Sequence, residues 1–282
     1  SVAEAGAMDP QQRLLLEVGY TALHAAPLDR AALSGSAAGV FVGIASIEFA
    51  QVLASLPAGL SVYAATGSSL SIASGRVSYA LGLHGPSISY DTACSSALIA
   101  AHAGLRALQH RECSSGVIMG VMLMLAPGMS QCFAVAGMTS ARGRSHTFDV
   151  RADGYARGEA VGGTSLCTGR AGMAELAGSA VRQDGRSASL TAPSGLAQRG
   201  LLAEALLDAG TSAGELSLNE AHGTGTSLGD PIEAGSLSAV LLEGCGLRSA
   251  PLAWRGVKAS AGHAEAAAGS TGLVQLAVGL CF

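Results

Sequence analysis

The chain is poor in charged and aromatic side chains. Only 13% of its 282 residues are Asp, Glu, Lys or Arg, and only 4% are Phe, Trp or Tyr. Charge usage is about half of the ~25% found in ordinary globular proteins, so we expect a large surface to be buried in a homodimer. The net charge of −4 and the scarcity of aromatic rings disfavour a nucleic-acid partner.

The chain also lacks metal-binding, disulfide and targeting patterns. No C-x-x-C pair and no Cys/His spacing suited to zinc is present among the six cysteines Cys94, Cys113, Cys132, Cys167, Cys245 and Cys281. We therefore expect no bound metal, and reduced thiols in an intracellular, cytoplasmic protein. Ser1 to Met8 shows no targeting signal. The most apolar segment, Gly269 to Phe282, is too short to span a membrane and predicts a buried helix.

Apolar runs alternate with helical patterns along the whole chain. Strands are predicted at 40–44, 86–90, 116–125, 160–167 and 173–182. Helices are predicted from Pro10, at 69–79, 96–110 and 197–210, from about 230, and after His263. No linker separates two parts of different composition. The pattern is typical of an α/β fold with a mainly parallel, buried sheet.

One cysteine lies between an apolar strand and an Ala- and Leu-rich helix. Cys94 follows the strand at 86–90 and precedes the helix at 96–110. Unpaired N–H groups and the dipole at a helix start favour a thiolate, which is the form that attacks a carbonyl carbon. A buried structural cysteine is the alternative, and this stretch alone leaves both open.

A glycine-rich stretch surrounds the first notable histidine. In E-A-H-G-T-G-T (220–226), glycines beside His222 allow a ligand to approach the backbone, and Thr224 and Thr226 supply uncharged hydroxyls. The stretch has no lysine and is therefore not a phosphate-binding P-loop. Taken alone, His222 is better explained as a loop histidine with a structural role.

A second histidine lies between a lysine and a glutamate, in front of a helix of small side chains. Lys258, His263 and Glu265 fall within eight residues. A cation near an imidazole lowers its pKa and keeps it neutral, able to donate one hydrogen bond. Glu265 can orient either group. A surface Lys–Glu pair beside a helix-capping histidine is the alternative.

The segment 147–163 is rich in glycine and charge, and it includes the carboxylates Asp149 and Asp153. It has fewer ligands than an EF-hand calcium loop. We predict a structural loop with internal Asp–Arg pairing.

Seven motifs occur in a fixed order over nearly the whole chain. They are M-D-P-Q-Q-R-L-L-L-E (8–17), D-T-A-C-S-S-A-L (91–98), F-D-V-R-A-D-G-Y-A-R-G-E (148–159), Q-D-G-R (183–186), L-T-A-P-S-G (190–195), E-A-H-G-T-G-T-S-L-G-D-P-I-E (220–233) and V-K-A-S-A-G-H-A-E-A-A-A-G (257–269). Together they resemble the β-ketoacyl synthase family, most closely the ketosynthase domains of modular polyketide synthases and related fatty acid synthases. The resemblance implies a thiolase-like fold, with five layers (α-β-α-β-α) from a duplicated unit, and a homodimer.

The resemblance also implies the reaction, a decarboxylative Claisen condensation in polyketide or fatty acid biosynthesis. Cys94 accepts an acyl chain, and His222 and His263 assist decarboxylation of a malonyl-type extender. In chemical terms, imidazoles directed at the developing enolate oxygen stabilise the transition state. Capture of the acyl chain on Cys94 makes the carbon–carbon bond formation effectively intramolecular.

Further residues and partners follow from the same resemblance. Lys258 and Glu265 match supporting residues, and Thr224 and Thr226 match residues that contact a phosphopantetheine arm. The substrates are carried on the phosphopantetheine of an acyl carrier protein, and no cofactor is bound directly. Neighbouring synthase domains such as an acyltransferase are expected partners. Ser260 stands where the family commonly has asparagine, which affects local hydrogen bonding.

The resemblance predicts one partial domain over 1–282. Its N-terminal-type half covers about 1–170, and the C-terminal-type half begins at about 171 and continues to 282. We expect the family's first strand to precede Ser1 and its C-terminal part to follow Phe282. We also expect the isolated piece to be poorly stable or inactive.

The same fold also occurs with three functions other than condensation. A non-elongating ketosynthase that only transfers acyl chains often lacks a histidine, whereas both are present here. A non-catalytic scaffold or chain-length partner would be expected to lack the nucleophile, whereas Cys94 is present. A plain thiolase is disfavoured by the paired histidines.

Overall fold

The computed structural model describes residues 1–26, 30–169, 172–243 and 251–280. The chain forms two compact units that are interleaved along the sequence. The first unit comprises Ser1–Cys132, Gly158–Gly172 and Ala264–Phe282, and the second comprises Phe133–Arg157 and Met173–His263. No disulfide involves Cys94, Cys113, Cys132 or Cys167, and Cys245 and Cys281 lie outside the described residues. The predicted halves near residue 170 stay a prediction.

A four-stranded sheet forms the centre of the first unit, in the order β2-β1-β3-β4. Its strands are β1 (Gly39–Gly43), β2 (Ser87–Tyr90), β3 (Ser115–Met122) and β4 (Ala160–Cys167). β1 pairs in parallel with β2 and β3, whereas β4 is antiparallel to β3. The predicted mainly parallel sheet is confirmed, and all four strands fall on predicted segments.

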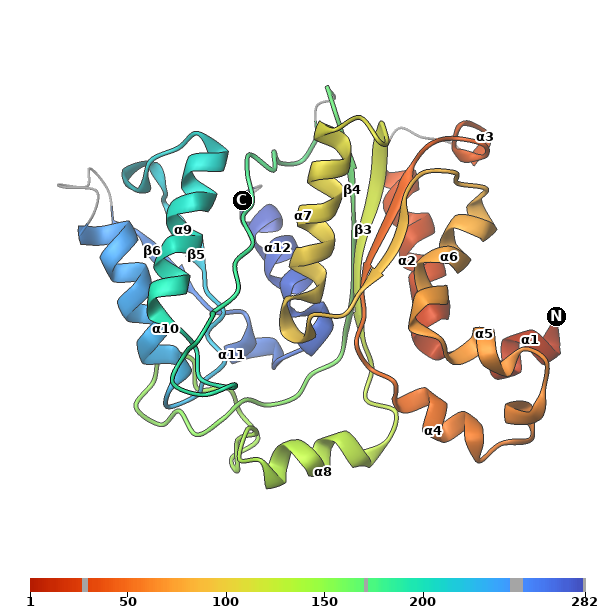
Figure 1. Cartoon of the computed structure of the whole chain (residues 1–282), viewed down its shortest axis with the longest axis horizontal. Helices are drawn as coiled ribbons and strands as arrows, with labels where there is room; N and C mark the ends of the chain where they lie inside the picture. The colour runs from red at the N-terminus through yellow and green to blue at the C-terminus, as the bar shows by residue number, and fades with distance from the viewer. Residues whose placement is uncertain (27–29, 170–171, 244–250, 281–282) are drawn as a thin grey trace. The chain divides into compact units, whose positions relative to one another are not determined.

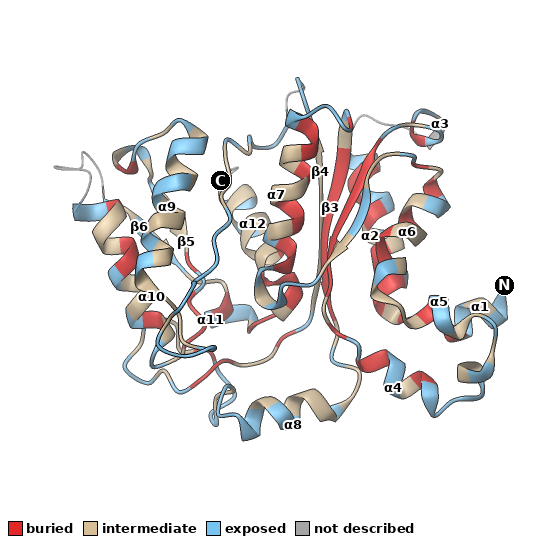
Figure 2. Cartoon of the chain, viewed as in Figure 1, coloured by how far each residue is buried: buried red, intermediate tan, exposed pale blue. Residues whose placement is uncertain are grey.

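Helices cover both faces of this sheet (Figure 1). α2 (Pro10–Ala25) and α6 (Leu70–Leu81) pack on one face, and α7 (Ser96–Gln109) and α12 (Ala268–Gly279) pack on the other. Side chains of a strand alternate between faces. Val40 and Val42 of β1 therefore join the core under α2 and α6, while Phe41 packs with residues of α7. Figure 2 shows that buried residues follow β3 and the inward sides of α2 and α7.

Shorter elements complete the first unit. They are α1 (Val2–Ala7), α3 (Arg30–Leu33), α4 (Glu48–Ala54), the 3-10 turn η1 (Pro57–Leu60), α5 (Ala64–Ser68), and the 3-10 turns η2 (Ala93–Ser95) and η6 (Glu265–Ala267). α8 (Pro127–Val135) crosses the boundary between the units.

The second unit is built on a parallel pair of strands, β5 (Leu218–Glu220) and β6 (Ala253–Arg255). Its helical elements are α9 (Gly195–Ala209), the 3-10 turn η3 (Ala213–Glu215), α10 (Gly229–Leu237), the π-helical turn η4 (Ser238–Leu242) and α11 (Lys258–Ala261). Its core joins residues of α9, η3, α10, η4 and β6. Leu202 and Leu206 of α9 pack there, as their helical spacing predicts.

Two sequence predictions need correction. The segment 173–182 forms no strand, because the Ser179 N–H donates to Asp208 Oδ2 of α9 at 2.9 Å instead of joining a ladder of hydrogen bonds. The predicted buried helix after Gly269 forms as α12, but it is buried only in its first turn. Val278 is 43% exposed, and residues 281–282 lie outside the described part. Among the described residues, no helix combines the length and apolar character that crossing a membrane requires.

Candidate active site

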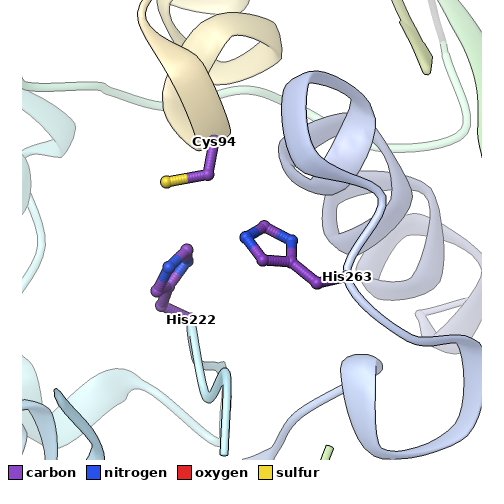
Figure 3. A group of neighbouring side chains, drawn as sticks. All are labelled: Cys94, His222 and His263. Carbon is purple, nitrogen blue, oxygen red and sulfur yellow. The ribbon is translucent and has the colours of Figure 1, made fainter. Parts of the chain in front are cut away.

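Cys94 lies in the 3-10 turn η2, two residues before the first residue of α7 (Figure 3). The residue is half-buried. Ala93 has a φ of +54°, in the left-handed region that non-glycine residues rarely adopt. The Ser96 hydroxyl fixes the turn, because it accepts the Thr92 N–H at 2.9 Å and donates to the Ala93 carbonyl at 2.6 Å. Strained backbone held in this way is typical of functional sites.

A glycine at the end of β1 and one within β3 let the first turn of α7 approach the sheet. A Cβ atom on Gly43 would lie 2.4 Å from the Ala97 backbone nitrogen, and one on Gly120 would lie 2.9 Å from the Ala97 Cβ. Real Cβ atoms do not approach that closely, so only glycine fits at Gly43. Close packing of the start of α7 against β1 and β3 therefore fixes the segment that contains Cys94.

His222 and His263 face each other in the second unit. Their ring centroids are 5.5 Å apart and the rings are perpendicular, at 89° (Figure 3). His222 follows β5 on the glycine-rich loop, and His263 follows α11. His263 is 4% exposed, and its Nδ1 has no hydrogen-bond partner among the described residues. Two sequence-predicted residues 41 positions apart are thus brought together by the fold.

Both imidazoles are held in the neutral form. Burial, followed by the charge of Lys258, lowers the pKa of His222 to about 4. Burial, followed by His222 and Lys258, lowers the pKa of His263 to about 3. The predicted effect of the cation is confirmed, although burial is the larger cause. At pH 7 each ring can donate one hydrogen bond and accept another.

His222 differs from His263 in that it retains exposed surface. Water at that surface would stabilise an imidazolium and weaken the effect of burial on the pKa. Water also screens the charge of Lys258 at an exposed ring, while the buried ammonium still lowers the pKa. Both causes act in the same direction, so the neutral ring is favoured at pH 7.

Lys258 is buried, at 5% exposed, and opens α11. Its Nζ donates to the His222 carbonyl oxygen at 2.5 Å. The ammonium thereby fixes the backbone that carries His222, in addition to its effect on the pKa of both rings. The alternative of a surface position is wrong for this lysine, because its side chain is buried.

Two carboxylates at the start of α10, which the sequence analysis did not single out, hold the histidine loop. Glu233 accepts the N–H groups of His222 and Gly223 at 2.6 and 2.7 Å. Asp230, 4% exposed, accepts those of Gly225 and Thr226 at 3.1 and 3.2 Å. Burial raises the pKa of Glu233, while these hydrogen bonds and Lys258 oppose the rise. In the sequence, acidic residues in the first turn of a helix that follows a glycine-rich loop could have indicated that carboxylates bind the N–H groups of that loop.

The loop at 145–157 supports His263. The His263 N–H donates to the Ala156 carbonyl at 2.7 Å, and the Tyr155 ring lies edge-on to the imidazole at 5.0 Å between centroids. The same loop contains the predicted Asp149–Arg151 pair, with oxygen and nitrogen 2.8 Å apart. The prediction of a structural loop is confirmed, but its contact with the histidine was not foreseen.

The remaining predicted residues occupy different places. Thr224 is buried and Thr226 half-buried, with their hydroxyl oxygens 3.4 Å apart on the histidine loop. Glu265 opens η6 in the first unit, with a φ of +40°. Within the first unit, η6 packs against η2, the turn that contains Cys94.

Metal ligands do not gather within either unit taken by itself. In the part of the chain that the structure describes, neither unit alone holds three Cys, His, Asp or Glu side chains close enough to share an ion.

Family models match the chain from end to end. The β-ketoacyl synthase N-terminal domain matches residues 1–171, and the β-ketoacyl synthase C-terminal domain matches residues 173–280. The chain belongs to the β-ketoacyl synthase family. Members of this family are acyltransferase-type condensing enzymes.

Curated relatives of this chain include polyketide synthases. It is 44% identical over 282 residues to polyketide synthase GfsB of Streptomyces halstedii, covering 98% of this chain and 5% of that protein. It is 43% identical over 290 residues to erythronolide synthase EryA3 of Saccharopolyspora erythraea, covering 99% of this chain and 9% of that protein. The chain thus spans a small part of these relatives.

Solved ketosynthase structures share the fold of this chain. The oxazolomycin ketosynthase domain OzmH KS7 of Streptomyces albus JA3453 matches with a TM-score of 0.91 at 36% identity, over 99% of this chain and 50% of that chain. The ketosynthase from module 6 of the bacillaene synthase of Bacillus subtilis 168 matches with a TM-score of 0.84 at 34% identity, over 96% and 48%. The fold is thiolase-like.

Proposed function

We propose that this chain is the condensing part of a polyketide synthase. It accepts an acyl chain on Cys94 and joins it to a malonyl-type extender by decarboxylative Claisen condensation. The observation that carries the proposal is the pair of neutral imidazoles, His222 and His263, held 5.5 Å apart beside a buried lysine. Family membership supports it.

Chain continuity supports the assignment of Cys94 and the two histidines to one site. His263 is bonded through the main chain to Ala264, and η6 begins one residue later. Within the first unit, η6 packs against η2, which contains Cys94. His263 is therefore two residues away from a turn that touches the turn of the nucleophile. His222 accompanies His263 as its ring partner.

The first step is acyl transfer. The Cys94 thiolate attacks the carbonyl carbon of the acyl thioester. The new carbon–sulfur bond forms as the bond to the carrier sulfur breaks, and the carrier leaves as a thiol after taking up a proton. The start of α7 favours the anionic nucleophile through its N–H groups and dipole.

The second step is decarboxylation. The bond between the extender's carboxylate and its α-carbon breaks, CO₂ leaves, and the electron pair forms an enolate with its charge on the thioester oxygen. Because no acceptor among the described residues faces Nδ1 of His263, its proton is better placed on Nε2, where it can be donated to that oxygen. Neutral donors positioned in advance stabilise the developing charge.

The third step forms the carbon–carbon bond. The enolate carbon attacks the carbonyl of the acyl group on Cys94, the carbon–sulfur bond breaks, and the Cys94 thiolate returns. The substrates would be carried on the phosphopantetheine of an acyl carrier protein, whose arm would contact Thr224 and Thr226. Lys258 and Glu265 would have supporting roles. A homodimer and neighbouring synthase domains such as an acyltransferase complete the proposal.

The test is an incubation of the complete ketosynthase domain that contains this chain with acyl and malonyl carrier-protein thioesters, in which CO₂ release and the mass of the protein are both followed. We expect a stoichiometric acyl adduct on Cys94 and CO₂ release coupled to a longer product. Acyl transfer without CO₂ would indicate a non-elongating ketosynthase, and no adduct would indicate a scaffold. A chelator belongs in the assay, because thiolate and imidazole are ligand types that Zn²⁺ favours.

A further inference from the structure

Thr147 lies outside the motifs that mark the family, yet it contacts the histidine loop. Its Oγ1 donates to the Gly223 carbonyl oxygen at 2.6 Å. Gly223 directly follows His222 and has a φ of +47°. A loop in this conformation forms no regular ladder of hydrogen bonds, so its carbonyl groups need partners from elsewhere. The Thr147 hydroxyl supplies one of them.

The methyl group of Thr147 contacts the backbone of a second active-site segment. A Cβ on Gly223 would lie 2.5 Å from Thr147 Cγ2, and a Cβ on Gly256 would lie 2.6 Å from the same atom. Gly256 stands two residues before Lys258, whose Nζ in turn donates to the His222 carbonyl. Thr147 therefore lies between the segment of His222 and the segment of Lys258, and it fits because both neighbours are glycines.

The residue after Thr147 anchors it from the other side. The Phe148 N–H donates to Asp230 Oδ2 at 2.7 Å, and the Phe148 ring packs against Trp254 of β6 at 6.1 Å between centroids. Phe148 has a φ of +53°. Asp230 also accepts two N–H groups of the histidine loop. Asp230 therefore joins the segment of Thr147 to the histidine loop that Thr147 contacts.

We propose that Thr147 is a positioning residue that fixes the His222 loop against the Lys258 segment for the decarboxylation step. It touches no reacting atom and acts through the backbone of Gly223. The inference rests on the function proposed above for His222. An ordinary structural threonine would affect stability and both half-reactions alike, whereas a positioning residue affects the step that uses the histidines.

The test compares Thr147→Val, which keeps the shape but loses the hydroxyl, with Thr147→Ser, which keeps the hydroxyl. Thr21→Val is the control, because Thr21 is exposed on α2, in the first unit and outside the family motifs. The first readout is hydrogen exchange of the amides of residues 222–226. Loss of one hydrogen bond is expected to speed their exchange about 5- to 10-fold in Thr147→Val, with little change in Thr147→Ser or the control.

The second readout separates the half-reactions. In Thr147→Val we expect malonyl decarboxylation to slow about 10- to 100-fold, because small displacements of catalytic groups are costly, while acylation of Cys94 stays within about twofold. Thr147→Ser should recover most of the loss. Unchanged exchange in Thr147→Val, or equal slowing of both half-reactions, would overturn the inference. If the amides exchange faster in Thr147→Val but even the unaltered protein releases no CO₂, then Thr147 positions the His222 loop while the proposed function is rejected.

Discussion

The buried imidazole of His263 makes the stability of the protein sensitive to acid. Its pKa is about 3 in the folded state, against about 6.5 in an unfolded chain. Between these values the unfolded state binds a proton that the folded state does not. The stabilising effect of the neutral ring is therefore fully present above about pH 6.5 and is lost as the pH falls from there toward 3.

The magnitude follows from the two pKa values. Between pH 7 and pH 5 the proton taken up on unfolding costs the folded state about 2 kcal/mol, because each pH unit below 6.5 contributes about 1.4 kcal/mol. The side chain is 4% exposed, so solvent screening reduces this figure little. His222 is left out of the calculation because it retains exposed surface.

The assay is urea unfolding at pH 7 and pH 5 for the unaltered protein and for His263→Gln, which does not titrate. We expect the unaltered protein to lose about 2 kcal/mol more than His263→Gln on acidification. The comparison removes contributions of other histidines, which are common to both proteins. An identical loss in the two proteins would show that His263 titrates normally, and the argument for a neutral pair would fail.

Three further predictions follow from the packing around the site. Lys258→Met should raise the pKa of the neighbouring imidazoles only part of the way toward 6.5, because burial is the larger cause; imidazole proton NMR would measure this, and unshifted rings would contradict it. Glu233→Gln should lower the free energy of unfolding by about 2–4 kcal/mol, because the amide keeps only one acceptor oxygen: one of the two hydrogen bonds to the carboxylate is lost and the other becomes a neutral one. The exposed control Glu175→Gln should change the free energy little in urea unfolding, and equal effects of the two variants would argue against the carboxylate's role. Gly43→Ala should destabilise the folded protein by about 1–3 kcal/mol through a steric clash with α7. Gly75→Ala, in open space within α6, should instead stabilise it by about 0.5–1 kcal/mol. Thermal melting measures both effects, and similar shifts of the melting temperature in the two variants would refute the clash.

The strand, turn and helix around Cys94 could be predicted because each is signalled locally. An apolar run, a set of small polar residues and an Ala- and Leu-rich segment follow one another, and all three elements formed. The positive φ of Ala93 could not be predicted, because alanine has no preference for that conformation. It is held by the Ser96 hydroxyl, which bonds to the backbone of Thr92 and Ala93.

The strand predicted at 173–182 failed for a physical reason. A strand exists only with a partner to accept its hydrogen bonds, and sequence pattern does not reveal the partner. Here the side chain of Asp208 takes the place of a neighbouring strand at Ser179.

The two histidines show the limit of reasoning from spacing. Each stretch alone left a structural alternative open, and only the family resemblance paired them before the structure did. The carboxylates Asp230 and Glu233 were visible in the same motif as His222, but their hydrogen bonds to its backbone depend on how the loop folds back over the start of α10. Such tertiary hydrogen bonds have no sequence period to reveal them.

The central claim is that Cys94 captures the acyl chain while the two imidazoles serve decarboxylation. The most direct measurement is the ratio of Cys94 acylation to CO₂ release in a His222→Ala/His263→Ala double variant, followed by mass spectrometry and trapped CO₂ in one reaction. The account predicts acylation close to that of the unaltered protein and CO₂ release reduced at least about 100-fold. CO₂ release at the unaltered rate would contradict it.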